Sequence, residues 1–333
     1  MVPGSPVEMA APLRIGLIGA GKHGSRYAHH ITADLGDVAR LTVLCRRDRT
    51  AGEAAARDHR CRFTNEIDAV LAAPDVDAVA VVVPPTLHVT ICERAAAAGK
   101  AILIEKPLAP SLADARRIRT ALDRHPVPFM VAHTLRFNTV VRALAERIEA
   151  IAPVQAVYLS QRFERSPLDW LDQPALAGGG IVIHTGVHSF DLLRVFTGTE
   201  PTAAWCRTWQ VHTRATEDNF VAHVALGGGI AGLVMGSRST DGRNGLIEIV
   251  GARGQLVGDH THHLGYLIQG RTRTALDLGP ESPTVLAVLR AFVDAVRGAT
   301  AMPITWHDGR AAVAVAEACY RSATSGQVEP VPA

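Results

Sequence analysis

Apolar and polar positions alternate in blocks along the first part of the chain. Short apolar runs occur at residues 14–18, 41–45, 78–83, 101–104 and 129–131, and the segments 50–57, 89–98 and 111–123 between them are expected as helices. Ser111, with Asp114 three positions later, has the pattern of a helix N-terminus. Strands that alternate with helices in this way are typical of a parallel sheet with helices on both faces. We therefore expect residues 13–133 to form a doubly wound, Rossmann-type α/β domain.

The pattern changes after about residue 132. Strand-like stretches follow at 154–162, 203–211, 220–226, 230–237, 246–250 and 255–257, and helical stretches at 185–196, 284–297 and 309–322. Most of these strands are separated by glycine or polar turns, which favours antiparallel pairing. Residues 134–333 are therefore expected to form an α+β domain with a largely antiparallel sheet. Residues 1–12 have neither the basic nor the apolar region of a signal peptide, and we interpret them as a tail.

Composition narrows the classes of partner. The 333 residues are 47% hydrophobic, which is enough for a full core, and 34 Lys and Arg against 32 Asp and Glu give a formal charge of +2. So small a charge gives no reason to expect nucleic-acid or membrane binding, and we expect a small-molecule partner. No apolar run approaches the roughly 20 residues that span a bilayer. Five scattered cysteines without a CxxC pair predict neither disulfides nor a zinc site, and fit a reducing cytoplasm.

A glycine-rich turn follows the first expected strand. The stretch "RIGLIGAGKHG" gives Gly19, Gly21 and Gly24 the spacing G-x-G-x-x-G, directly before a helical segment. The first glycine permits a tight turn, the second lets a pyrophosphate approach the backbone, and the third lets the helix pack closely. This context predicts a dinucleotide site, with Lys22 and His23 inside the turn as further candidate cofactor contacts.

The end of the second strand bears on the choice of cofactor. In such domains an acidic residue usually binds the adenosine ribose there, but "TVLCRRDRT" has Arg46 and Arg47. A guanidinium can bind a 2′-phosphate that a carboxylate would repel, so NADP(H) is favoured and NAD(H) remains possible. In the alternative interpretation both arginines are solvated and Asp48 binds the ribose.

The third apolar run ends in "VVVPPTLH". Pro84 and Pro85 stop the strand and predict a turn, in which Pro84 and Thr86 could lie beside the nicotinamide ribose. His88 has two interpretations from the sequence. It contacts cofactor or substrate, or it only begins the next helix.

The fourth run, "ILIEKP", ends in a carboxylate, an amine and a proline. The carboxyl edge of a parallel sheet is where ligands bind, so Glu105 and Lys106 are candidate cofactor contacts. Lys106 either is solvated at the end of the strand or takes part in the reaction. In ketone reduction negative charge grows on the carbonyl oxygen, and an ammonium group at this edge could stabilise it and transfer a proton.

Five motifs in order resemble the Gfo/Idh/MocA oxidoreductases, named for glucose-fructose oxidoreductase and inositol dehydrogenase. They are "GLIGAGKHG", "VDAVAVVVPPTLH", "AGKAILIEKP", "GGGIVIHTGVHSFDLL" and "DGRAAVAVAEACYRSATSG", and the resemblance extends over nearly the whole chain. The resemblance implies a Rossmann domain followed by an α+β domain with an open antiparallel sheet that often forms dimer or tetramer contacts. It also implies a nicotinamide cofactor and substrates that are sugars, cyclitols or their keto forms.

The resemblance further implies roles for individual residues. Lys106 would be catalytic and Pro107 would commonly be cis, and His188 would be a second catalytic group. Many members have Asp four residues before that histidine, where this chain has His184. An Asp would hold a substrate hydroxyl and favour a protonated His188, whereas a second imidazole lacks the fixed negative charge.

His184 and His188 are four residues apart and are expected on one face of a helix, with one as general acid/base and the other orienting substrate. The alternative is a packed histidine pair. Such a pair also fits a zinc-binding helix, but the glutamate of HExxH is replaced by Thr185, and we expect no metal. Asp191 either hydrogen-bonds His188 or faces solvent. The run of His260, His262 and His263 is interpreted as a solvated loop.

Candidate substrate contacts come from two further stretches. "AHTLRFN" begins the second domain and offers His133, Arg136 and Asn138 for the cleft between domains, while "SQRFERSPLDW" adds Arg162, Arg165 and Trp170. The arginines could hold an anionic or hydroxylated ring, or could simply point outward from a surface strand.

These observations predict an NADP(H)-dependent oxidoreductase of a sugar-like or cyclitol-like alcohol or ketone, forming a homodimer or homotetramer through its C-terminal sheet. Two alternatives remain. One is a family variant whose tightly held cofactor is oxidised and reduced within a turnover, with net epimerisation, elimination or glycoside hydrolysis. The other is a protein that senses NADP(H) without turnover.

Overall fold

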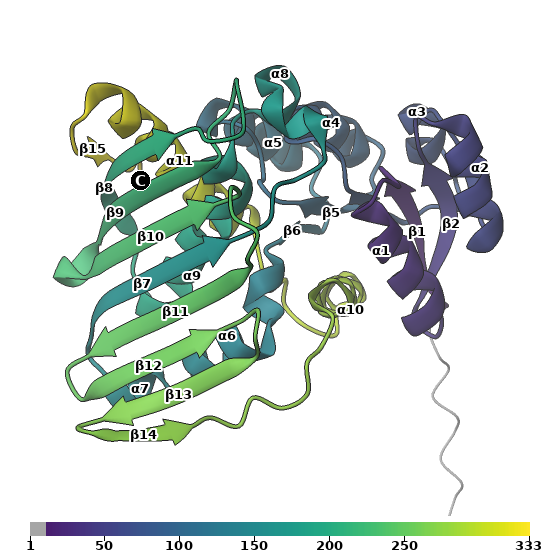
Figure 1. The fold of residues 1–333 in the computed structure, drawn as a ribbon. Coiled ribbons are helices and arrows are strands. Elements are labelled where there is room, and N and C mark those ends of the chain that lie inside the picture. Colours follow the sequence, from purple (N-terminus) through teal and green to yellow (C-terminus); the bar gives the residue numbers. More distant parts are fainter. Residues whose placement is uncertain (1–10) are drawn as a thin grey trace, which may run out of the picture.

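The computed structural model describes residues 11–333, which form two sheets with helices between and around them (Figure 1). The first sheet is parallel throughout, in the order β3-β2-β1-β4-β5-β6. Its strands are β1 (Leu13–Ile18), β2 (Ala39–Cys45), β3 (Arg62–Thr64), β4 (Ala78–Val81), β5 (Ala101–Glu105) and β6 (Phe129–Ala132). The expected doubly wound domain is confirmed, and all strands end at the same edge of the sheet.

Helices cover both faces of this sheet. They are α1 (Gly24–His29), which continues as a π-helix (His30–Asp34), α2 (Arg49–Asp58), α3 (Ile67–Leu71), α4 (His88–Ala97) and α5 (Leu112–Arg124). The Ser111 side chain accepts a hydrogen bond from the Asp114 backbone N–H, as the sequence predicts for the start of α5. The short strand β3 was not predicted, because its residues are only partly buried and leave no apolar run.

The second sheet has the order β14-β13-β12-β11-β7-β10-β9-β8-β15, and β7 with β10 is its one parallel pair. Its strands are β7 (Val154–Arg162), β8 (Pro201–Trp209), β9 (Asn219–Leu226), β10 (Ala231–Ser237), β11 (Asn244–Gly251), β12 (Gly254–Asp259), β13 (Leu264–Gln269), β14 (Thr272–Ala275) and β15 (Glu329–Pro330). The largely antiparallel sheet is confirmed. Sequence reasoning missed the edge hairpin β13–β14, where β14 is exposed at every residue and shows no buried periodicity.

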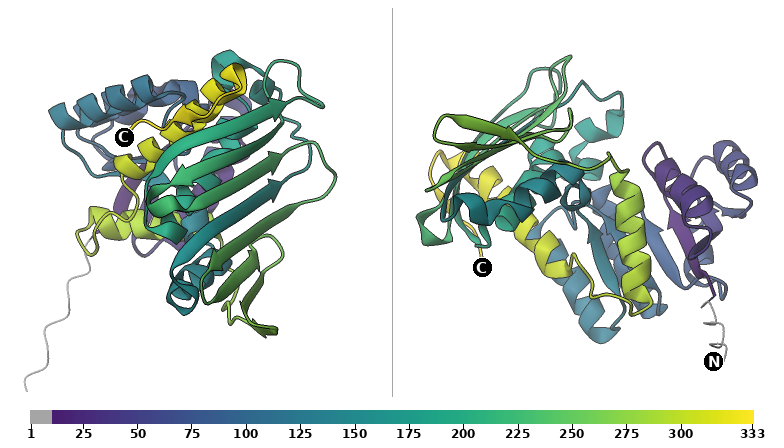
Figure 2. Two further views of the ribbon diagram at one scale, coloured as in Figure 1. Left: turned by 90° about the vertical axis from the view of Figure 1, so that its left-hand side faces the viewer. Right: turned by 90° about the horizontal axis from the view of Figure 1, so that it is seen from below.

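The helices of the second part leave one face of the larger sheet without a covering helix (Figure 2). They are α6 (Thr139–Glu146), α7 (Ile148–Ile151), α8 (Pro174–Ala177), a π-helix (Val182–Gly186) that runs into α9 (Val187–Thr197), α10 (Thr284–Val296) and α11 (Trp306–Ser325). Helix α10 contacts α1, and α11 contacts α5 and β6, so late segments of the chain pack on the first sheet's layer. No helix within residues 11–333 is long and apolar enough to cross a membrane.

Candidate active site

The glycine turn has the shape that a dinucleotide requires. Gly19 has φ +99°, and a Cβ there would lie 2.1 Å from the Val82 carbonyl oxygen. A Cβ on Gly24 would lie 1.9 Å from the Gly19 carbonyl oxygen, so both positions need glycine for the fold itself. Gly21 differs, because a Cβ there would meet nothing within 4 Å. That open space is where a pyrophosphate would approach the backbone, and the turn therefore fits the expected cofactor.

Arginines follow the end of β2 beside this turn. The Arg46 guanidinium donates a hydrogen bond to the Ala20 carbonyl oxygen at 3.1 Å, and Arg47 is exposed. Asp48 caps α2, where its carboxylate accepts from the Ala51 N–H at 3.0 Å. The arginine nearest the glycine turn thus keeps further N–H donors for an anion, whereas the neighbouring carboxylate is engaged at a helix end.

The turn after β4 is tied to two distant parts of the chain. Pro84 is half-buried, and the Thr86 hydroxyl donates to the Leu176 carbonyl oxygen in α8 at 3.0 Å. His88 begins α4 and is fully buried, with Nδ1 3.0 Å from the Pro107 carbonyl oxygen and Nε2 3.1 Å from that of Val83. The ring therefore joins two loops at the ligand edge, and its nitrogens face backbone and not the cleft.

Glu105 is the centre of a buried hydrogen-bond network at the end of β5. Its carboxylate lies 2.7 Å from His23 Nε2, accepts from the Tyr27 hydroxyl at 2.6 Å, and accepts from the Lys106 N–H at 3.1 Å. Burial alone would raise the pKa of Glu105, but His23, Lys106 and the Tyr27 hydroxyl favour the carboxylate and lower it to about 2. The network fixes the direction in which the next residue leaves the strand.

That next residue is Lys106. The Lys106–Pro107 peptide is cis, and the Lys106 Nζ donates to the His184 carbonyl oxygen at 2.9 Å. No other hydrogen bond of this ammonium group is found within residues 11–333, so two N–H donors are left for a ligand. Burial lowers the pKa of Lys106, the Glu105 charge opposes that shift, and the Arg238 charge adds to it.

The positive charge of Lys106 acts on both histidines of the glycine-rich motif. Burial and then the charges of Arg238 and Lys106 lower the pKa of His184 well below its ordinary value, and burial and Lys106 do the same for His188. Each ring has its own neighbour: the Trp170 ring lies edge-on to His184 at 5.5 Å, and His133 lies edge-on to His188 at 6.3 Å. Both imidazoles are therefore neutral near pH 7 and can donate or accept one proton.

Behind His188 lies an ion-pair network. The Arg136 guanidinium binds the Asp191 carboxylate at 2.7 and 2.5 Å and the Asp308 carboxylate at 2.9 Å. His133 Nδ1 lies 3.9 Å from Asp191, too far for a hydrogen bond. Both interpretations of Asp191 from the sequence are wrong. Its carboxylate does not hydrogen-bond His188 and does not face solvent, because the residue is 1% exposed and pairs with Arg136. The network supports the helix that carries His188. It also occupies the Arg136 guanidinium, which the sequence had suggested as a substrate contact, with two carboxylates of the protein itself.

The structure does not bring all expected substrate residues together. Arg162 contacts Met235 on the outer face of the larger sheet, since the alternation along β7 turns Gln161 and not Arg162 toward the helices. Arg165 is exposed beyond the end of β7. The histidine run is a turn between β12 and β13, but His260 is not the solvated residue that we expected, because its Nε2 is buried without a partner.

Sequence reasoning missed Arg238, which directly follows β10. Its charge is near enough to lower the pKa of both Lys106 and His184. Nothing around it in the sequence "GSRSTDG" marks it as a ligand-binding residue, and only the register of β10 beside β7 and β9 brings it to the site.

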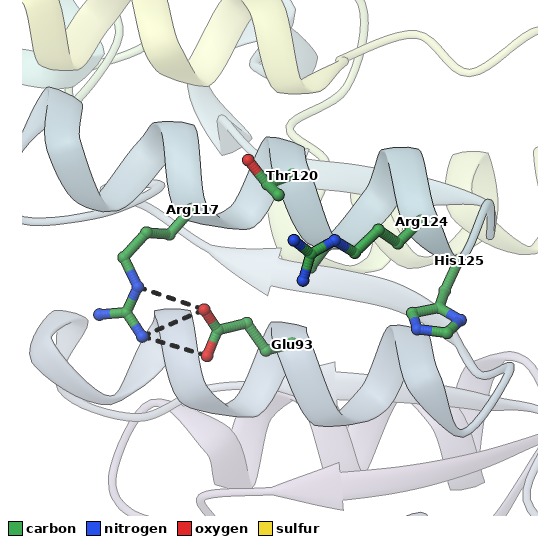
Figure 3. Close-up of a pocket in the computed structure, with 6 residues that line it drawn as sticks. Glu93, Arg117, Thr120, Arg124 and His125 are labelled. Atoms are coloured by element: carbon green, nitrogen blue, oxygen red, sulfur yellow. Dashed lines mark hydrogen bonds and ion pairs between the residues drawn. The ribbon is translucent and has the colours of Figure 1, made fainter.

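Two other features lie away from this edge. A surface hollow of about 260 Å³ between α4 and α5 is crossed by the ion pair of Arg117 with Glu93 (Figure 3), and Thr120, Arg124 and His125 also line it. Its groups are at the outer helical surface and are not connected to Lys106. Among the described residues, His29, His30 and Asp34 form the one cluster with ligand atoms within 4.8 Å of one another. The cluster is largely exposed at the end of α1 and on the π-helix that follows it.

Comparison with known proteins gives consistent matches along the chain. Residues 13–133 match a family described as an oxidoreductase family with an NAD-binding Rossmann fold, and residues 140–257 match the GFO/IDH/MocA C-terminal domain. Inositol 2-dehydrogenase from Rhizobium meliloti (strain 1021) is 29% identical over 328 residues, which cover 93% of this chain and 96% of that protein.

Solved structures agree with this. GenD2 from gentamicin A biosynthesis, in complex with NAD, is 26% identical with a TM-score of 0.87, and the alignment covers 100% of both chains. Levoglucosan dehydrogenase, in complex with NADH and levoglucosan, has a TM-score of 0.87 at 21% identity, over 97% of this chain and 100% of that one. The likeness to levoglucosan dehydrogenase, at 21% identity, supports the fold alone.

Proposed function

Because the chain belongs to the Gfo/Idh/MocA family of oxidoreductases, we propose that it transfers hydride between NADP(H) and a sugar-like or cyclitol-like alcohol or ketone. The observation that carries the proposal is Lys106, held by the Glu105 network and by His184 with donors left over, at the sheet edge that carries the glycine turn. The relatives' names agree with such a substrate class.

The cofactor contacts proposed are the turn residues Gly19, Gly21 and Gly24 with Lys22 and His23, the arginines Arg46 and Arg47, and Pro84, Thr86, Glu105 and Lys106 at the neighbouring strand ends. The open space at Gly21 favours a pyrophosphate there. The position of Arg46 favours the 2′-phosphate of NADP(H) over the free hydroxyls of NAD(H). His88 would act as a positioning residue for the two loops that it joins.

When bound, the nicotinamide accepts or supplies the hydride. In alcohol oxidation the neutral Lys106 amine accepts the hydroxyl proton, and in ketone reduction its ammonium form stabilises the growing charge on oxygen and donates the proton. The lowered pKa of Lys106 brings both forms closer to neutral pH. His188 would exchange a second proton, while His184 and Trp170 orient the substrate ring.

The uncovered face of the larger sheet supports a homodimer or homotetramer. Its outward side chains form a row across neighbouring strands, with Trp205 opposite His223, His223 opposite Leu233, and Leu233 opposite Tyr158. Trp205 is 37% exposed and Leu233 is 47% exposed. A second copy of the same face would bury this row.

The test is a fluorescence titration of the purified protein with NADPH and NADH, followed by turnover of a polyol and ketosugar panel. Lys106→Ala should lower kcat by roughly 10²- to 10⁴-fold. Its effect on the cofactor Kd should be much smaller, because the glycine turn and the arginines after β2 still bind the cofactor. Normal turnover by Lys106→Ala would exclude the mechanism. Cofactor that copurifies and never exchanges, with net isomerisation of the sugar, would favour the internal-redox variant instead.

A further inference from the structure

Arg238 is half-buried, and one nitrogen of its guanidinium is buried without a hydrogen-bond partner. Along β10 the buried residues Gly232, Val234 and Gly236 face the covering helices, and the same alternation turns Arg238 to that side. Its Nη2 is buried and has no hydrogen bond. Within residues 11–333 its side chain makes neither a hydrogen bond nor a close ion pair, although its backbone N–H donates to the Asp218 carbonyl oxygen.

This arrangement is costly for the ligand-free protein. A guanidinium N–H group that is removed from water without a hydrogen-bond partner lowers the stability of the folded protein, and native structures keep few such groups. Hydrogen bonds connect this strand end to the reaction centre: the Arg238 N–H donates to Asp218 O, and the adjacent Glu217 binds the Val182 N–H, two residues before His184. The charge of Arg238 also acts on Lys106 and on the imidazole of His184. Two positive groups that act on each other in this way attract an anionic ligand, and the planar guanidinium suits a carboxylate in particular.

The carboxylates nearest to Arg238 are engaged elsewhere. Glu217 accepts hydrogen bonds from Gly180 N, Val182 N and the Tyr320 hydroxyl, and so ties the "GGG" segment to the strand end. Asp218 accepts from three backbone N–H groups of residues 211–213. These two negative charges leave Arg238 without hydrogen bonds but offset much of the local positive charge, which favours a monoanion over a dianionic phosphate.

We propose that Arg238 is a specificity-determining residue that binds the carboxylate of a sugar-acid substrate, a uronic or aldonic acid whose reacting carbon lies at Lys106. The assignment rests on the proposed hydride-transfer function, because it places the acid group relative to that reaction centre. It replaces Arg162 as the arginine of the site, since Arg162 lies on the outer face of the sheet.

Binding of matched carbohydrate pairs tests the assignment. Calorimetry with NADPH-loaded protein, in which an alcohol cannot be oxidised, compares glucuronate with glucose and galacturonate with galactose. The wild type should bind each uronate roughly 10- to 100-fold tighter than its aldose, as charge-assisted hydrogen bonds predict. Arg238→Met should bind uronate and aldose with about equal affinity, and Arg238→Lys should keep part of the preference for the uronate. Arg243→Met is the matched control, because Arg243 is exposed and paired with Glu164.

A second readout separates binding from a structural role. Arg238→Met should raise the unfolding temperature of the ligand-free protein, because it removes a buried N–H group that has no hydrogen-bond partner. A lower unfolding temperature together with an unchanged uronate-to-aldose ratio would overturn the proposal. So would equal affinity of the wild type for uronates and aldoses, failure of every uronate to bind, or tighter binding of glucose 6-phosphate than of glucuronate.

The outcomes also distinguish this inference from the function on which it rests. Uronate binding that depends on Arg238, without turnover in either direction, would refute the oxidoreductase function and leave the carboxylate site standing. Turnover of neutral sugars without any preference for uronates would refute the carboxylate site alone.

Discussion

Arg46 is the residue on which the choice between the two nicotinamide cofactors depends. Its guanidinium lies against the Ala20 carbonyl oxygen, beside the space over Gly21. The NADP(H) preference remains a prediction, because the family match specifies an NAD-binding fold without deciding between the two forms.

Arg46→Asp should raise the ratio of the NADPH to the NADH dissociation constant by roughly 10- to 100-fold, or about 1–3 kcal/mol, because a guanidinium bonded to the 2′-phosphate becomes a repelling carboxylate. Titration of both reduced cofactors measures this ratio. Arg40→Asp is the control, since Arg40 is exposed near the other end of the same strand. An unchanged ratio in Arg46→Asp would remove the reason for preferring NADP(H).

The Glu105 carboxylate has two roles. Its hydrogen-bond network orients Lys106, and the same network stabilises the folded protein. Its pKa falls from 4.5 to about 2 on folding, so the folded state favours the ionised form. The resulting stabilisation is complete above about pH 4.5 and is lost as the pH falls toward 2.

Glu105→Gln should therefore be destabilised relative to wild type at neutral pH, with a pH-dependent part of at most about 3 kcal/mol. That part should shrink as the pH is lowered below 4.5, because Glu105 becomes protonated in the unfolded chain while the folded protein holds it ionised until about pH 2. Urea unfolding between pH 7 and pH 3 measures it. Glu281→Gln, at an exposed position, is the matched control. A Glu105→Gln difference that stays constant over this range would contradict the role of the network.

At the scale of elements, the β1–α1 turn separates two uses of glycine. Gly24 lets α1 pack on the turn, and a Cβ there would lie 1.9 Å from the Gly19 carbonyl oxygen. Gly21 serves no packing function within the described chain, since nothing lies within 4 Å of its Cβ position. The same motif therefore contains a residue needed by the fold and a residue needed by the ligand.

Gly24→Ala should lower the stability of the cofactor-free protein by roughly 1–3 kcal/mol, because backbone must move to admit the methyl group. Gly21→Ala should change that stability by less than about 0.5 kcal/mol and yet weaken NADPH binding at least about tenfold. Thermal unfolding without cofactor and a titration of each variant test both statements. Wild-type cofactor affinity in Gly21→Ala would show that no pyrophosphate lies over that residue.

For the whole molecule, the uncovered face of the larger sheet is the feature that bears on oligomer formation. Helices occupy only the side that faces the Rossmann domain (Figures 1 and 2), and exposed apolar residues such as Trp205, Leu233 and Leu246 remain on strands of the sheet. Nothing in residues 11–333 covers this row, and we therefore expect a second copy of the chain to do so.

Leu233→Asp should convert the oligomer into monomers, because it introduces a charge at the centre of the proposed apolar interface. Light scattering coupled to gel filtration gives the mass directly. Val328→Asp is the matched control, since Val328 is 64% exposed in the loop between α11 and β15. A monomeric wild type, or an oligomer unaffected by Leu233→Asp, would exclude the sheet as the interface.

The amino-acid sequence by itself determined the elements whose signals are local. Continuous apolar runs predicted β1, β2, β4, β5 and β6, the Ser111 cap predicted the start of α5, and the glycine spacing predicted the dinucleotide turn. Each signal lies within a few neighbouring residues, so backbone geometry and burial periodicity suffice to recognise it. The edge strands β3 and β14 were missed, because exposed strands leave no such periodicity.

Only the tertiary structure decided which polar groups meet. His88 turned out to face backbone, Arg136 to pair with Asp191 and Asp308, and Arg162 to lie on the outer face of its sheet. Arg238 came to the site, although it lies 132 residues after Lys106 in the chain. Strand register and the packing of distant segments set these contacts, and a shift of one residue along β10 would have turned Arg238 to the opposite face.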